Sequence, residues 1–329
     1  MPFKSSLARS AGKLLGVFKE RDLSLRGAAS EYYAPVTLSV TGGNTSYTYG
    51  GKKIHVWTSP GPFVVTGGPA SLEYFVVGAG GAGGADMGGG GGGGGVTTGS
   101  LTLSGPFSTT VAVGAAGTAQ ARNSATPTAA IGSVSILPNP VSTITAFGGG
   151  YGQGDSDPDT DFANLKNTRD LGSGGGGYGQ GDPKAGGPAT NYPGPTQQGT
   201  PGYTTAPPDK GGGGGGAGAP AHSGTDPQQD GGYGIAIPTT FRDPSNPYGG
   251  PNGPPQSSIT GNFYFAGGGA GGNPSNGNAW AGGGSVSEPP PAAPGTANTG
   301  GGGAGGPGNG GAPGGNGGMG IVFVSYTPA

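Results

Sequence analysis

Residues 73–95, EYFVVGAGGAGGADMGGGGGGGG, decide the fold, because here a hydrophobic stretch runs directly into almost uninterrupted glycine. The chain ends on a similar pattern, since residues 320–326 read GIVFVSY after another glycine-rich field. Short apolar runs bounded by glycine are typical of buried strands. We therefore expect these two strands to pair and to bracket the glycine-rich residues between them in one domain.

Residues 78–83, GAGGAG, fit the G-x-G-x-x-G pattern of dinucleotide-binding sites. That site also needs a helix that begins at the glycines and an acidic residue about twenty positions later. Here Met87 is followed by eight glycines, which are poor helix formers, and no acidic residue lies between Asp86 and Asp155. The pattern therefore predicts no nucleotide site.

Glycine (84 residues) and proline (33) are abundant enough among the 329 residues to be typical of a low-complexity chain, yet only 9% of residues are charged. A threefold helix of the polyproline II kind leaves every backbone N–H and C=O free to bond sideways, and glycine lets such helices pack closely. We therefore expect residues 148–319 to form packed polyglycine or polyproline II-type helices. A flexible linker is the alternative.

Residues 1–28 differ from the rest of the chain. Their apolar residues recur at steps of three and four, and basic residues outnumber acidic ones. This pattern predicts an amphipathic helix that docks on a partner, and a membrane-surface helix or a transit sequence stays open. No segment is long and apolar enough to span a bilayer. The predicted docking positions are Phe3, Leu7, Leu14 and Phe18.

The period changes to alternation after this segment. Residues 29–50 are expected to form a connector and the first strands, and residues 51–147 contain short strands separated by Gly, Pro and Asn, as in a sandwich or barrel. The expected fold class is mainly β, with an N-terminal helix and a β-sandwich-like domain. The glycine-rich body at 148–319, with variable loops, is closed by a C-terminal strand in residues 320–329.

Residues 50–84, GGKKIHVWTSPGPFVVTGGPASLEYFVVGAGGAGG, resemble the glycine-rich domain common in bacteriophage tail-fibre and other virion appendage proteins. The shared pattern is an entry strand, an F-x-V strand and a V-x-Y-x-V-V strand followed by glycine. Its usual ending, G-I-V-x-V-x-Y, is matched by residues 320–326. The interior matches mainly in composition, and this chain carries a long insert rich in Tyr, Pro and Asp.

The resemblance implies a virion structural protein, most simply a tail-fibre or host-contacting adhesin subunit on a tail appendage. It also implies that other virion proteins hold the N-terminal segment and that the subunit is a homo-oligomer, with a trimer as the usual arrangement. A capsid-surface fibre or decoration protein would share these features. An extracellular glycine-rich structural protein is the second alternative.

Four aspartates alternate with other residues in the insert, as in the first half of an EF-hand loop. The glycine needed at the sixth position is Thr160 and the glutamate needed at the twelfth is Lys166, so the EF-hand motif is absent. A loose divalent-cation site and a solvated acidic turn both remain as interpretations, and no other cofactor is expected. The candidate ligands are Asp155, Asp157, Asp159 and Asp161.

Few residues could support catalysis or nucleic-acid binding. His55 and His222 are the only histidines, and the chain has no cysteine for a thiolate nucleophile or metal site. Basic residues after Arg122 are few and scattered, which disfavours nucleic acid. We therefore expect a protein that is not an enzyme.

Aromatic residues are spread through the glycine- and proline-rich insert. At loop tips they would give a host glycan or protein receptor a large contact area at low entropy cost. The alternative is a structural role in filling gaps around the glycine helices. The candidate receptor contacts are Tyr233, Phe241, Tyr248, Phe263, Tyr264 and Trp280.

Overall fold

The computed structural model describes residues 38–119, 121, 127–140, 142–154, 172–178, 199–200, 202, 210–221, 229–251, 257–272, 277–286, 292–308 and 311–328. The strands in these ranges are β1 (Ser39–Gly42), β2 (Thr45–Tyr49), β3 (Lys52–Trp57), β4 (Gly61–Thr66), β5 (Ala70–Val77), β6 (Val96–Leu103), β7 (Phe107–Val111), β8 (Ser135–Leu137), β9 (Ile144–Ala146), β10 (Ile235–Ala236), β11 (Tyr264–Phe265) and β12 (Ile321–Tyr326). Two short 3-10 helices accompany them, η2 (Pro127–Ala130) and η3 (Thr239–Phe241).

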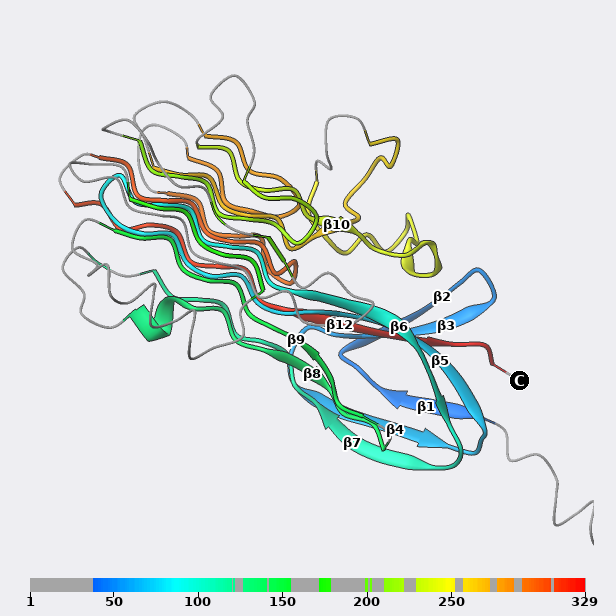
Figure 1. Ribbon diagram of the computed structural model, residues 1–329. Helices are drawn as coiled ribbons and strands as arrows, with labels where there is room; N and C mark the ends of the chain where they lie inside the picture. Colours follow the sequence, from blue (N-terminus) through cyan, green and yellow to red (C-terminus); the bar gives the residue numbers. More distant parts are fainter. Residues whose placement is uncertain are drawn as a thin grey trace, which may run out of the picture.

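The main sheet has five antiparallel strands in the order β2-β3-β12-β5-β6. Its middle strand, β12, comes from the C-terminal end of the chain, so residues far apart in sequence meet in one sheet (Figure 1). Val322 lies opposite Val76 of β5 on one side and Trp57 of β3 on the other. The predicted pairing of the strand before the glycine with the C-terminal strand is confirmed.

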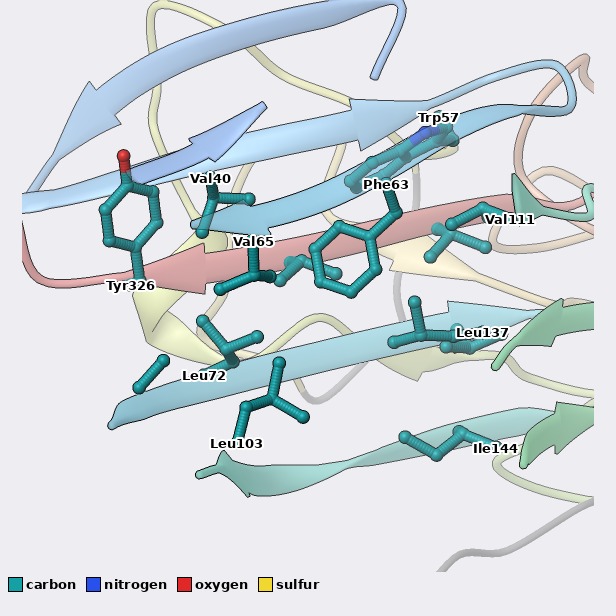
Figure 2. Close-up of a cluster of buried hydrophobic side chains, with 14 of the residues drawn as sticks. Val40, Trp57, Phe63, Val65, Leu72, Leu103, Val111, Leu137, Ile144 and Tyr326 are labelled. Atoms are coloured by element: carbon teal, nitrogen blue, oxygen red, sulfur yellow. The ribbon is translucent and has the colours of Figure 1, made fainter. Parts of the chain in front are cut away.

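A second sheet of three strands, in the order β1-β4-β7, covers one face of the main sheet. The side chains between the two sheets form a buried core, in which Phe63 and Val65 of β4 lie over Leu72 of β5 (Figure 2). Trp57 packs edge-on against Phe63, with ring centroids 5.6 Å apart, and its indole N–H donates to the carbonyl of Pro62 at 3.1 Å. The two sheets therefore form a sandwich.

The opposite face of the main sheet is also buried. Phe323 of β12 is completely enclosed, and a set of aromatic rings from strand β5 and from residues 241–265 surrounds it. The ring centroids nearest to that of Phe323 are those of Tyr248 at 5.6 Å, Phe241 at 5.7 Å, Phe265 at 5.9 Å and Phe75 at 6.1 Å. The main sheet is thus the middle of three layers.

The glycine-rich residues run as extended segments away from the main sheet (Figure 1). We call the central segment 88–95 and its six hydrogen-bonded neighbours the glycine lattice; the neighbours are 78–84, 147–153, 172–177, 210–215, 267–272 and 300–306. Each neighbour is also bonded to the next, so the six enclose the central segment completely. The lattice therefore has a buried interior made of backbone.

Hydrogen bonds within the lattice repeat every third residue. From the central segment, Gly89, Gly92 and Gly95 donate to residues 147–153, Gly90 and Gly93 donate to residues 212–215, and Gly91 and Gly94 donate to residues 300–303, over N···O distances of 2.7–2.9 Å. Three residues per turn is the repeat of the polyproline II helix, here built from glycine. Successive residues point their N–H groups at three different neighbours, and this cross-links the segments in all directions.

Side chains are excluded from the lattice by its spacing. A Cβ atom on Gly91 would lie 2.1 Å from the carbonyl oxygen of Gly81, which no real side chain tolerates. Each backbone hydrogen bond contributes only about 1 kcal/mol net, similar to the 1–2 kcal/mol of conformational entropy lost by each ordered residue. The stability of the lattice therefore depends also on the sheets, because strands β5, β6 and β9 lead directly into it.

The expected fold class was wrong where it included an N-terminal helix and a closed domain. The described residues are mainly β and contain no α-helix, and residues 1–28 lie outside them. The sheets are antiparallel and open, since β2 and β6 are free edges of the main sheet within the described part. An apolar stripe shows which face a helix could bury, but helix stability comes mostly from a packing partner, which the stripe does not supply.

Candidate functional site

The molecule has two unlike ends. The first described strand, β1, and the C-terminal end of β12 lie at the sandwich end (Figure 1). At the opposite end, which we call the distal end, residues 84–88 turn the chain from one lattice segment into the next. Asp86 and Met87 in this turn have φ of 55° and 56°, the left-handed conformation that tight turns require. The amide of Asp86 donates to Ala312 at 3.0 Å.

Several lattice segments end level with the distal turn. Gly272 donates to Gly88 at 2.8 Å, Gly306 donates to Gly84 at 2.7 Å, and the backbone of Gly154 lies against Ala85. Beyond these points the chain leaves the described part, at residues 155–171, 273–276 and 309–310. Segments 147–153, 267–272 and 300–306 thus end beside the distal turn.

Two groups of predicted residues lie outside the described ranges. These are the four aspartates of the candidate cation site, Asp155, Asp157, Asp159 and Asp161, and the four docking positions Phe3, Leu7, Leu14 and Phe18. Within the described ranges, no group of three or more His, Cys, Asp or Glu side chains could hold a metal ion. No helix in those ranges is long and apolar enough to cross a bilayer.

Most of the candidate receptor contacts are packed inside the molecule. Phe241 and Phe263 belong to the core on the second face of the main sheet, and Tyr264 of β11 is buried as well. Tyr248 is half-buried, stacks on Tyr47 with centroids 6.3 Å apart, and its hydroxyl lies 2.7 Å from that of Thr45. These rings attach the glycine-rich residues to the sheet.

Tyr233 and Trp280 are different, because both are half-buried and they contact each other. Their ring centroids lie 5.5 Å apart at an interplanar angle of 61°. Burial raises the pKa of the Tyr233 hydroxyl, and the negative charge of Asp230 raises it further. The ring pair therefore stays uncharged at neutral and mildly alkaline pH.

His55 is the one described histidine, and it sits inside the sheet region. Its Nδ1 lies 2.7 Å from the carbonyl oxygen of Gly42, whereas its Nε2 is buried and has no hydrogen-bond partner. Burial lowers the pKa of the imidazole, which is therefore neutral at pH 7. The ring stacks on Tyr326, with centroids 6.1 Å apart. His55 is only 4% exposed, so its role is in the packing of the sheets.

Residues 58–327 match the family model of a glycine-rich domain. The chain belongs to this family. The match begins after β3 and includes β12, so it covers the lattice and every described strand except β1, β2 and β3. Among curated proteins, none matches the chain significantly.

In this glycine-rich domain, sequence reasoning missed the second core around Phe323. The available signal was β12 itself, because residues 321–324 are apolar without alternation and a strand of that kind is buried on both faces. A covering layer was therefore needed, and the aromatic residues of the insert supply it.

Proposed function

We propose that this chain is a bacteriophage virion structural protein, most simply a tail-fibre or host-contacting adhesin subunit. The sequence resemblance to virion appendage domains motivates the proposal. In this role the N-terminal segment attaches the subunit to other virion proteins. The subunit would act mechanically and adhesively, without a catalytic role or a cofactor.

The observation that carries the proposal is the cross-linking of the glycine lattice by backbone hydrogen bonds. All six neighbours of the central segment are hydrogen-bonded to it, which makes an elongated body that does not depend on side chains. Because backbone bonds hold the segments, the connections between them can change in length and sequence without disturbing the interior. A rigid support whose connections can vary in this way suits a protein that must follow changes in a host receptor.

The resemblance also supplies the proposed assembly. A symmetric homo-oligomer, with a trimer favoured, would bind other virion proteins on one side and a host cell-surface glycan or protein on the other. Nucleic acid is not a proposed partner. A capsid-surface fibre or decoration protein has the same requirements for rigidity and attachment, so the position on the particle must be measured.

The test is immunogold electron microscopy on virus particles purified from cultures that produce the protein. Antibodies are raised against the folded recombinant chain, and preimmune serum is the control. Label on tail appendages is the expected result. Label across the head would replace the tail-fibre proposal by the capsid-surface alternative. Absence from all intact particles, with label on the cell surface instead, would overturn the virion role in favour of an extracellular structural protein.

A further inference from the structure

Tyr233 and Trp280 form an aromatic pair on two adjacent glycine segments. The segments are joined where the amide of Gly231 donates to the carbonyl of Asn278 at 3.0 Å. Both rings are partly open to solvent, whereas the neighbouring positions Gly232 and Ala281 are buried in the packed backbone. The two rings are therefore partly exposed beside small residues that are buried.

The backbone holds both rings in place. The carbonyl of Trp280 accepts from Gly283 at 2.9 Å across a tight turn, in which Ala281 and Gly282 have φ of 51° and 89°. These values are typical of a type I′ turn. A Cβ on Gly282 would lie 2.2 Å from the hydroxyl oxygen of Thr299, so packing as well as φ requires glycine there. A ring on such a turn loses little freedom when it binds a ligand.

Tyr233 is equally constrained. Its carbonyl accepts hydrogen bonds from Gly218 at 2.9 Å and from Ala219 at 3.1 Å. Asp230 lies three residues earlier, close enough for its charge to act on the Tyr233 hydroxyl, and its carboxylate accepts from the backbone amide of Asn278 at 2.8 Å. This bond fixes the second segment beside the first. Asn278 is exposed two residues before Trp280, and its side chain offers an amide donor and acceptor.

We propose that Tyr233 and Trp280 form a binding site for one neutral pyranose residue of a cell-surface glycan. The inference rests on the proposed host-contacting function and names the chemistry of one contact. Aromatic rings bind the apolar C–H face of a sugar, while its hydroxyl groups need amide or hydroxyl partners such as Asn278. Two rings suit a single sugar, whereas a specific protein partner needs about 800 Å² on each side.

The two tryptophans of the chain allow a direct test, because each gives one indole N–H signal in a ¹H–¹⁵N spectrum. Trp57 is fully buried and bonded to Pro62, so it is an internal reference. The probes are the methyl glycosides of glucose, galactose, mannose and N-acetylglucosamine, each added to about 50 mM because a contact this small corresponds to a millimolar dissociation constant. The variant Trp280→Phe assigns the two signals.

The expected result is that at least one glycoside shifts the Trp280 signal and leaves that of Trp57 in place. Tyr233→Ala should weaken that binding about tenfold, which corresponds to the loss of one aromatic contact. Tyr49→Ala is the matched control, because Tyr49 is an exposed tyrosine on strand β2, outside the pair, and its loss should change nothing.

Two outcomes would overturn the site: no shift of the Trp280 signal with any probe, or shifts of equal size in wild type and in Tyr233→Ala. Failure of the proposed function is seen separately, in the immunogold experiment. Sugar binding without label on virus particles would leave the site standing and remove the virion role. Label on tail appendages without sugar binding would keep the virion role and remove the sugar site.

Discussion

Replacement of Gly91 by alanine tests whether backbone packing holds the lattice together. Gly91 lies in the central segment, where its amide donates to Gly303 at 2.8 Å and its carbonyl accepts from Gly269 at 2.9 Å. The new Cβ would lie 2.1 Å from the carbonyl oxygen of Gly81 and 2.6 Å from its carbon. These atoms belong to the backbone and cannot rotate away. Segment 78–84 must therefore move outward.

The cost follows from the bonds that this movement breaks. Three hydrogen bonds join segment 78–84 to the central segment, from Gly78 to Gly95, from Gly81 to Gly92 and from Gly84 to Gly89. Their loss costs about 3 kcal/mol at about 1 kcal/mol each. Alanine recovers about 0.4–1 kcal/mol through the lower entropy of the unfolded chain. The net loss is at least about 2 kcal/mol, which lowers the melting temperature by about 4 °C.

Differential scanning calorimetry measures this effect, and Gly105→Ala is the matched control. Gly105 has open space around its would-be Cβ and no left-handed φ, so the same substitution should leave the melting temperature almost unchanged or raise it slightly. A Gly91→Ala protein that melts within 1 °C of Gly105→Ala, on a scale where about 4 °C is expected, would refute the packing argument.

Three further predictions concern the sheets. Because burial lowers the pKa of His55 from 6.5, the unfolded chain takes up this proton more readily than the folded chain as the pH falls below 6.5. Stability should therefore drop between pH 7 and pH 5, and urea titrations should show a smaller drop in His55→Gln. Phe323→Ala empties the fully buried centre of the second core and should cost about 3–5 kcal/mol, measured as a lower urea midpoint; an unchanged midpoint would contradict that core. Lys52→Ala removes a partly exposed ion pair with Glu73 and should cost less than about 1 kcal/mol by the same titration.

The bracketing strands could be predicted because each carries its own signal. Residues 73–77 and 321–326 are apolar runs next to glycine, and they pair as β5 and β12. The position of β12 between β3 and β5 could not be predicted, since either edge of the sheet satisfies the same pattern. Side-chain patterns specify which faces are buried, but the order of strands depends on how the whole chain packs.

The arrangement of the glycine segments was beyond sequence reasoning for a different reason. Glycine positions are chemically alike, so the sequence of residues 88–95 does not indicate that the amide of Gly90 donates to the carbonyl of Gly212 rather than to another carbonyl. The sequence also could not separate the buried aromatic candidates from the exposed ones. Phe241 and Trp280 both lie in glycine- and proline-rich sequence, yet the first packs on Phe323 and the second is half-exposed, and only the tertiary structure separates them.

Hydrogen exchange of the glycine amides tests the cross-linked lattice most directly. Selective ¹⁵N-glycine labelling resolves these amides in a ¹H–¹⁵N spectrum, and transfer to D₂O reports how long each stays protected. The amides of residues 89–95 all donate within the lattice, so they should exchange only when the structure opens widely, far more slowly than those of the exposed turn residues Gly50 and Gly51. Equal exchange in the two sets would show that the glycine segments are not held by backbone hydrogen bonds, and the rigid support on which the proposed function depends would be lost.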